Sequence, residues 1–394
     1  MKYDKLNKLN KRNTSMDIIR IIAVFSVISV HFFLNSEFYN QNVTGGNMYI
    51  MCVMRTFFSV CIPLFLILTG YLMAEKKLCK KYYLGIGKTL IIYLLASIAC
   101  IIFQIEYLHI RLTFKDAILR ILNYSCAPYS WYIELYIGLF LIIPFLNIIY
   151  KNLNSKRKKQ VLIATLVILT VLPTLFNIFN FDKADFWLNP TKSDAKTKIL
   201  PNWWISLYPI TYYFTGCYLR EYGLKFKTIT LLISLTVSVF AFGSFNFYRS
   251  YGETFESGDY LAWNGFEAFI MAVILFTLLS RLKANKLPSP IRFVLWKVSD
   301  SALGIYLLSY IFDTITYQQL IAKVTPMTER LKYFFVIVPF VFFCSLLASL
   351  VINIVLRIVN IAINELKGIG KFLKGNSEDI QVEIYNKPDN NAQP

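Results

Sequence analysis

Long hydrophobic runs separated by short polar segments make up most of the chain. We place ten runs, at 16–36, 50–74, 84–106, 128–150, 160–180, 203–222, 228–247, 260–280, 294–318 and 333–360. A helix needs about twenty apolar residues to cross a bilayer. The polar segments between the runs are too short to cover a separate soluble core. The pattern therefore predicts an all-α, polytopic integral membrane protein with about ten transmembrane helices.

Lys and Arg residues gather in alternate connections between the runs. Five precede the first run, five lie in 75–88, five in 151–159, and none in 36–49. Because cytoplasmic loops are enriched in Lys and Arg, this bias places both termini in the cytoplasm. The formal charge of +18 over 394 residues then reflects topology and does not indicate nucleic-acid binding. We divide the chain into a transmembrane domain at 1–374 and a polar, disordered cytoplasmic tail at 375–394.

The first hydrophobic run carries two ionisable residues, Arg20 and His31, which need an explanation inside a membrane. At ~100° per residue their separation of eleven leaves about 20° beyond whole turns, so both lie on one helix face. A rise of ~1.5 Å per residue separates them by roughly 16 Å along the axis. Ionisable residues that persist in a membrane span usually mark a pathway or a reaction site. We therefore favour function over simple packing for His31.

Further polar and aromatic residues fall in the outer halves of their predicted spans. Arg55 lies at a depth similar to that of His31, and Trp131, Tyr132 and Glu134 follow in the fourth span. Glu134 fits a buried ion pair and an active-site role equally well, because carboxylates in membranes nearly always find a partner.

Other residues that could carry chemistry receive less weight. Glu267 and Asp313 are further intramembrane acids, for which we favour a structural role. The seven cysteines are scattered and show no metal-ligand spacing, so neither a disulfide framework nor a metal site is expected.

Several segments, in order, resemble the membrane-integral acyltransferase 3 family. Arg20 and His31 are similar to its Arg-x10-His signature, and Ser130-Trp131-Tyr132 resembles its Trp-Tyr segment. The same holds for the segments Phe65-Leu-Ile-Leu-Thr-Gly70, Tyr213-Phe-Thr-Gly216 and Ser301-Ala-Leu-Gly304-Ile-Tyr306-Leu-Leu-Ser309. One departure is clear: Ser309 stands where the family has a histidine. The resemblance is to the standalone form, without an extracytoplasmic hydrolase-like domain.

The resemblance implies a membrane-bound O-acyltransferase of the bacterial cytoplasmic membrane. Such a protein takes an acyl group, acetyl being the expected one, from cytoplasmic acyl-CoA. It passes the group to a hydroxyl of an envelope glycan, such as an exopolysaccharide, or of a lipid-linked sugar. A proton-coupled transporter or flippase of an envelope precursor remains the alternative, and a non-catalytic component of a polysaccharide machine is a third class. Whether the chain forms a homo-oligomer is left open.

The chemistry of acyl transfer suggests a role for each of these residues, because the reaction needs a base, groups that bind the donor and stabilisation of the developing negative charge. His31 is the expected base, with transient acylation as an alternative, and Glu134 is expected to orient its ring. Arg20 is expected to bind donor phosphates, and Arg55 to stabilise negative charge near His31. The expected substrate contacts come from Trp131, Tyr132 and Tyr306.

Overall fold

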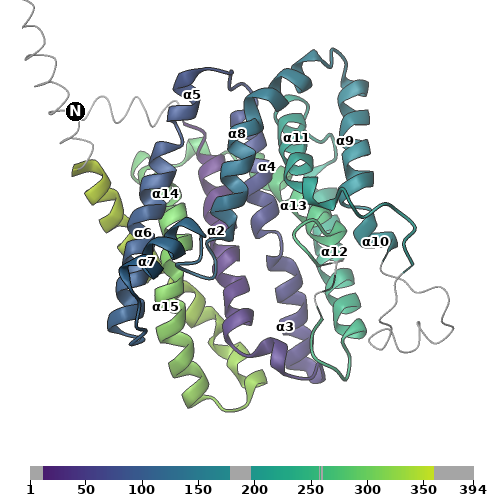
Figure 1. The fold of residues 1–394 in the computed structure, drawn as a ribbon. Coiled ribbons are helices and arrows are strands. Elements are labelled where there is room, and N and C mark those ends of the chain that lie inside the picture. The colour runs from purple at the N-terminus through teal and green to yellow at the C-terminus, as the bar shows by residue number, and fades with distance from the viewer. Residues whose placement is uncertain (1–11, 178–196, 257, 259–260, 359–394) are drawn as a thin grey trace, which may run out of the picture.

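The computed structural model describes residues 12–177, 197–256, 258 and 261–358, and these form a bundle of helices (Figure 1). The described part contains two isolated β-bridges and no longer strand. The helices are α2 (Thr14–Asn35), α3 (Gly45–Phe58), α4 (Cys61–Met73), α5 (Lys80–Leu84), α6 (Gly87–Glu106), α7 (Phe114–Leu122), α8 (Trp131–Asn152), α9 (Lys156–Thr170), α10 (Pro173–Phe176), α11 (Tyr208–Glu221), α12 (Thr228–Arg249), α13 (Phe266–Ser280), α14 (Ser289–Asp300) and α15 (Ala302–Lys323). A last helical stretch covers Met327–Ile358.

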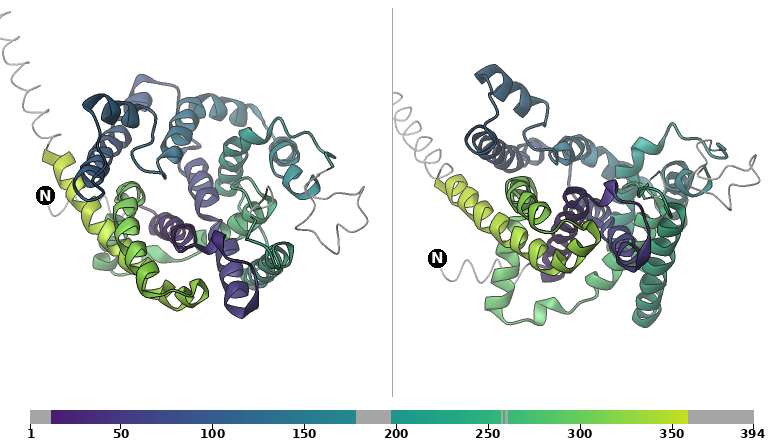
Figure 2. Two further views of the ribbon diagram at one scale, coloured as in Figure 1. Left: turned by 60° about the horizontal axis from the view of Figure 1, so that its bottom comes forward. Right: turned by 90° about the horizontal axis from the view of Figure 1, so that it is seen from below.

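Helix α2 lies in the interior of the bundle, as the view along the helices in Figure 2 shows. It packs against α3, α4, α13, α14 and α15. Its N-terminus is capped by Asn13, whose side chain accepts a hydrogen bond from the Ser15 amide at 3.0 Å. Because other helices surround α2, its polar side chains must find partners within the protein.

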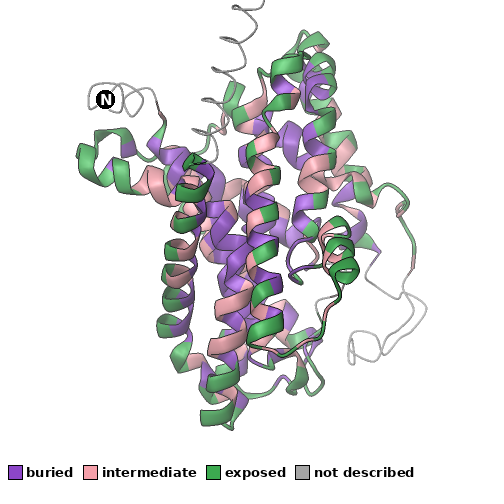
Figure 3. Cartoon of the chain, turned by 60° about the vertical axis from the view of Figure 1, so that its left-hand side comes forward, coloured by how far each residue is buried: buried purple, intermediate pink, exposed green. Residues whose placement is uncertain are grey.

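The outer helices expose apolar side chains, as expected for a protein whose solvent is lipid. Figure 3 shows buried residues concentrated in the inner helices and exposed ones along the outer faces and at the helix ends. Large exposed hydrophobic residues lie along α6, α12 and the last helical stretch, for example Ile102, Phe240 and Phe343. Seven helical segments are long and apolar enough to cross a membrane within the described residues. The chain is therefore a multi-pass membrane protein.

The predicted count of ten spans is not confirmed by these seven segments. The predicted spans 203–222 and 260–280 are helical, as α11 and α13, but these helices have only 14 and 15 residues. The predicted span 294–318 was wrong as a single helix, because the chain breaks at Ser301 between α14 and α15. The orientation of the termini is not tested, and the predicted tail at 375–394 lies outside the described residues.

The predicted span 50–74 is also broken, at Ser59 and Val60, between α3 and α4. Pro63 explains this break, because proline has no amide hydrogen and its ring collides with the carbonyl of the residue four positions earlier, here Ser59. At the break, the Ser59 hydroxyl donates to the Thr56 carbonyl at 2.7 Å. Both α3 and α4 pack on α2 and α13, and in addition α12 packs on α3 and α11 on α4.

Two glycines allow α4 and α11 to cross closely. A Cβ atom on Gly70 would lie 2.0 Å from the carbonyl oxygen of Tyr213, and one on Gly216 would lie 2.1 Å from that of Ile67. Small residues at such crossings let helix backbones approach, which is a common way for membrane helices to associate. Both glycines belong to the family-like segments of the sequence.

Candidate active site

Arg20 and His31 lie on the single uninterrupted helix α2, as predicted. His31 is 5% exposed, and its Nδ1 lies 3.0 Å from Oδ2 of Asp313 on α15. The ring of Tyr129 stacks on the His31 ring, with centroids 3.6 Å apart and planes 20° from parallel. The His31 imidazole is thus held on one edge by a carboxylate and on one face by an aromatic ring.

The Asp313 contact determines which nitrogen of His31 can act as a base. When Nδ1 donates to the carboxylate, Nε2 is left with its lone pair. Nε2 makes no hydrogen bond with the described residues. Ser309, one turn before Asp313, places its Oγ 3.4 Å from Nδ1 and donates to the Tyr306 carbonyl at 2.9 Å. Ser309, which stands where the family pattern has a histidine, therefore lies next to the His31 ring.

A cavity of about 690 Å³ opens beside α2 and reaches from its first turn to Val27. Residues of α2, α4, α6, α8, α14 and α15 line it. Such a volume is typical of sites for small molecules and cofactors. The cations Arg12, Arg20 and Lys88 line its end near the first turn of α2 together with two carboxylates, those of Asp17 and Asp300. Tyr132 and Tyr306 lie at its inner end with Val27. Three cations against two carboxylates at one end, and aromatic rings at the other, suit a ligand that carries its negative charge at one end only.

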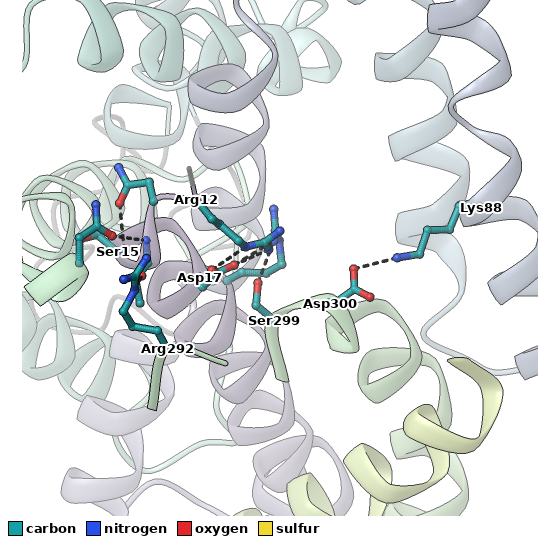
Figure 4. A network of polar contacts seen from close by, with 11 residues as sticks. Arg12, Ser15, Asp17, Lys88, Arg292, Ser299 and Asp300 are labelled. Atoms are coloured by element: carbon teal, nitrogen blue, oxygen red, sulfur yellow. Dashed lines mark hydrogen bonds and ion pairs between the residues drawn. The ribbon is translucent and has the colours of Figure 1, made fainter. Parts of the chain in front are cut away.

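The charged end of the cavity is shown in Figure 4, where Arg12, Asp17 and Ser299 lie together and Lys88 reaches Asp300 from another helix. Arg12 pairs with Asp17 through Nε at 2.7 Å, and Lys88 pairs with Asp300 at 2.8 Å. Arg20 donates from Nη1 to Ser299 Oγ at 2.8 Å. The same Nη1 lies 3.8 Å from Oδ1 of Asp17, whereas Nε and Nη2 make no hydrogen bond with the described residues and remain available for an anionic ligand.

His31 lies about one helical turn beyond the inner end of the cavity, as residue spacings in three segments of the chain indicate. Val27, which lines the cavity, precedes His31 by four residues on α2. Tyr306 precedes Ser309 by three residues, and Tyr132 follows Tyr129 by three. Tyr306 is 5% exposed, and its hydroxyl is buried without a hydrogen-bond partner among the described residues. A phenol in that position can donate to a ligand oxygen.

Arg55 and Glu134 are not brought to His31. The Arg55 guanidinium donates from Nε to the Tyr39 hydroxyl at 2.6 Å and lies 5.9 Å from the centre of the Trp263 ring. Glu134 is exposed on α8 and makes no hydrogen bond or ion pair with the described residues. Trp131 lies beside Trp263, with ring centroids 6.2 Å apart. Of the residues predicted from the sequence, Arg20, Tyr132 and Tyr306 line the cavity.

Asp313 takes the place next to His31 for which we expected Glu134. Asp313 is 1% exposed, and its Oδ1 has no partner among the described residues. A signal existed in the sequence, because Ser309 and Asp313 are four residues apart and share a helix face. Which of the three intramembrane acids meets His31 depends on how α15 packs on α2. In the described part of the chain, no group of His, Cys, Asp and Glu is arranged to hold a metal ion.

The fold and the cavity define a multi-pass membrane protein with a cavity that runs along its central helix α2 from the first turn of that helix. The acyltransferase domain characteristic of the acyltransferase 3 family matches residues 13–354. The chain therefore belongs to the acyltransferase 3 family, as its motifs predicted, and the family implies an acyltransferase. No curated protein and no solved structure matches the chain.

Proposed function

We propose that the protein transfers an acyl group, expected to be acetyl, from cytoplasmic acyl-CoA to a hydroxyl of an extracytoplasmic or lipid-linked envelope sugar in the bacterial cytoplasmic membrane. The observation that carries this proposal is the position of the His31–Asp313 pair just beyond the aromatic end of a cavity whose other end is cationic. Family membership supports acyl transfer, and the cavity supports a long donor with phosphates at one end.

The donor fits the cavity in one direction. Its phosphates lie near Arg20, whose Nε and Nη2 can form strong charge-assisted hydrogen bonds, and beside Arg12 and Lys88, which pair with Asp17 and Asp300. The pantetheine arm extends along α2, and the thioester reaches Tyr132 and Tyr306. Arg20 and Val27 are seven residues apart, which corresponds to roughly 10 Å of helix, so an extended arm spans this part of the cavity. This direction also agrees with the predicted cytoplasmic location of the first turn of α2.

The transfer needs one base and one donor to the developing oxyanion. Nε2 of His31 removes the proton from the acceptor hydroxyl, and the hydroxyl oxygen bonds to the thioester carbon. Tyr306 donates to the carbonyl oxygen as it becomes negative. The C–S bond then breaks, and the protonated His31 returns a proton to the thiolate. The products are the sugar ester and free CoA, with Asp313 holding the ring throughout.

Membrane vesicles that contain the protein can test the proposal with radiolabelled acetyl-CoA. We expect label to enter envelope carbohydrate, and mild alkali to release it as acetate, because O-acetyl esters are cleaved by base. Vesicles with His31→Gln serve as the matched control. A transporter has no reason to bind acetyl-CoA, so absence of both binding and labelling would favour the transporter alternative and contradict the proposal.

A further inference from the structure

Arg55 is a buried cation for which the described part of the protein offers no anion. It lies in α3, its side chain is 6% exposed, and Nη1 is buried without a hydrogen-bond partner among the described residues. The Tyr39 hydroxyl accepts from Nε, and no carboxylate of the described residues lies within ion-pair distance. A buried, unpaired charge is costly, so such groups are normally paired or serve a ligand.

Two indole rings stand next to this guanidinium. Trp263 lies under Arg55 at 5.9 Å, and Trp131 lies nearly parallel to Trp263, 20° apart in plane. Trp131 is 37% exposed and Trp263 is half-buried, so Trp131 supplies the exposed face of this aromatic pair. Flat aromatic faces provide apolar contact for the C–H face of a sugar ring, and a guanidinium binds carboxylate or phosphate in a bidentate manner.

This group is separate from the donor cavity. None of Tyr39, Arg55, Trp131 and Trp263 lines the cavity. Tyr39 follows the C-terminal end of α2, whereas Arg12 precedes its N-terminal end, and 22 helical residues lie between. Tyr39 lies in the segment 36–49, and Trp131 and Trp263 follow the segments 107–127 and 248–259. These segments contain none, three and one Lys or Arg residue, so we predict that they lie outside the cell.

We propose that Arg55, Trp263 and Trp131 form the binding site for the acceptor, and that this acceptor is an anionic saccharide. The rings contact the sugar, Arg55 binds its carboxylate or phosphate, and Tyr39 holds the guanidinium in place. The assignment rests on the proposed acyl transfer, since it is the acceptor of that reaction that binds here. It gives Arg55 a role in acceptor recognition in place of the stabilisation of negative charge near His31 that we expected from the sequence.

Tryptophan fluorescence of the purified full-length protein in detergent tests the proposal directly. Glucose, glucuronic acid and glucose 6-phosphate share a ring and differ in charge. Comparing the two acids shows whether Arg55 prefers a carboxylate or a phosphate. We expect a saturable change with at least one acid, and binding at least about 10-fold weaker for glucose, the minimum effect of losing a hydrogen bond to a charged group. Trp263→Phe should reduce the signal, whereas Trp296→Phe, at the far end of the protein near Arg12, should not.

Arg55→Gln should weaken binding of the acid by about 10- to 100-fold and leave glucose unchanged. Arg55→Lys should retain part of the affinity, because lysine keeps the positive charge but lacks the bidentate geometry of the guanidinium. Arg111→Gln is the matched control, since Arg111 is an exposed arginine on a loop of the same predicted side. If Arg55→Gln does not fold, Trp131→Ala replaces an exposed side chain and should weaken binding of acid and glucose alike.

Three outcomes would overturn the assignment: no saturable response to either acid, equal affinity for glucose and both acids, or unchanged binding of the acid in Arg55→Gln. Acetyl-CoA binding is measured on the same samples. If the unaltered protein does not bind acetyl-CoA, the proposed reaction is contradicted. If it binds acetyl-CoA but does not prefer the acids over glucose, only the acceptor site is contradicted.

Discussion

His31 combines three features that a proton-transferring residue needs. It has a fixed ring, a carboxylate on Nδ1 and a free Nε2 close to the inner end of the cavity. His31→Gln keeps a similar size and hydrogen-bonding capacity but removes basicity. We expect it to insert and fold normally and to lose about 10²- to 10⁴-fold in acyl transfer, the range that general bases contribute. Radiolabel transfer at equal membrane abundance measures this, and retention of more than half of the activity would assign His31 to packing.

Asp313 and Ser309 both approach Nδ1 of His31, and they provide a matched pair of substitutions. Asp313→Asn preserves shape but can present its amide group to Nδ1, which favours the tautomer with the proton on Nε2. We expect a loss of activity on the order of 10²-fold or more, as for other histidines deprived of their orienting carboxylate. Ser309→Ala removes a contact at 3.4 Å and should change activity little. The reverse order of effects would move the orienting role to Ser309.

Arg20 is expected to bind donor phosphates because it lines the charged end of the cavity with two hydrogen-bonding nitrogens free. Arg20→Ala should weaken acetyl-CoA binding by about 10-fold or more, the effect of losing a hydrogen bond to a charged group. Arg20→Lys should recover part of it. Calorimetric titration measures both, and Lys332→Ala, an exposed lysine outside the cavity, is the control. Unchanged affinity in Arg20→Ala would make this arginine structural.

At the scale of single residues, the sequence reveals which polar groups are unusual but not which ones meet. Arg20 and His31 were predictable because each interrupts an apolar run, and their shared face follows from helical periodicity. The partner of His31 was not, since three intramembrane acids were available and the choice depends on the packing of α15 beside α2. Arg55 shows the same limit, because its aromatic neighbour Trp263 lies more than 200 positions away in the chain.

At the scale of elements, hydrophobic runs predicted where helices occur but not where they break. The run 50–74 contains the reason for its break in Pro63, which the count of apolar residues ignores. The break at Ser301 is less visible, because α14 is amphipathic and ends just before an apolar helix. The glycines of the family-like segments acquire a physical meaning only in the structure, where Gly70 and Gly216 meet at one crossing.

The crossing of α4 and α11 can be tested with one methyl group. Gly216→Ala would place Cβ 2.1 Å from the Ile67 carbonyl oxygen, so the helices must move apart. We expect a destabilisation of about 1–3 kcal/mol, the usual effect of overpacking. Gly138→Ala in α8 is the control, since no atom lies within 4 Å of the added methyl group. Thermal unfolding in detergent measures both variants, and equal midpoints would contradict a tight crossing.

At the scale of the whole molecule, the two proposed sites require opposite ends of the bundle to face opposite sides of the membrane. The cavity opens near the start of α2, and the Arg55 site lies toward the end of that helix. A donor from the cytoplasm and an acceptor from outside then meet near His31. The orientation of the bundle in the membrane is predicted from the distribution of Lys and Arg alone, because the packing of the helices is the same whichever way the bundle is inserted.

Thiol labelling of intact cells tests this orientation with residues that the chain already offers. Cys79 is exposed in the lysine-rich segment after α4, predicted to be cytoplasmic, while the other cysteines of the described part are buried or half-buried. Asn42 is exposed in the segment without Lys or Arg, predicted to be outside. A membrane-impermeant maleimide should therefore label Asn42→Cys in a Cys79→Ser background on intact cells, and should label Cys79 in the unaltered protein only after the cells are opened. Labelling of residue 42 only after opening, with Cys79 labelled on intact cells, would invert the bundle and place the cationic end of the cavity outside, where acyl-CoA is not supplied.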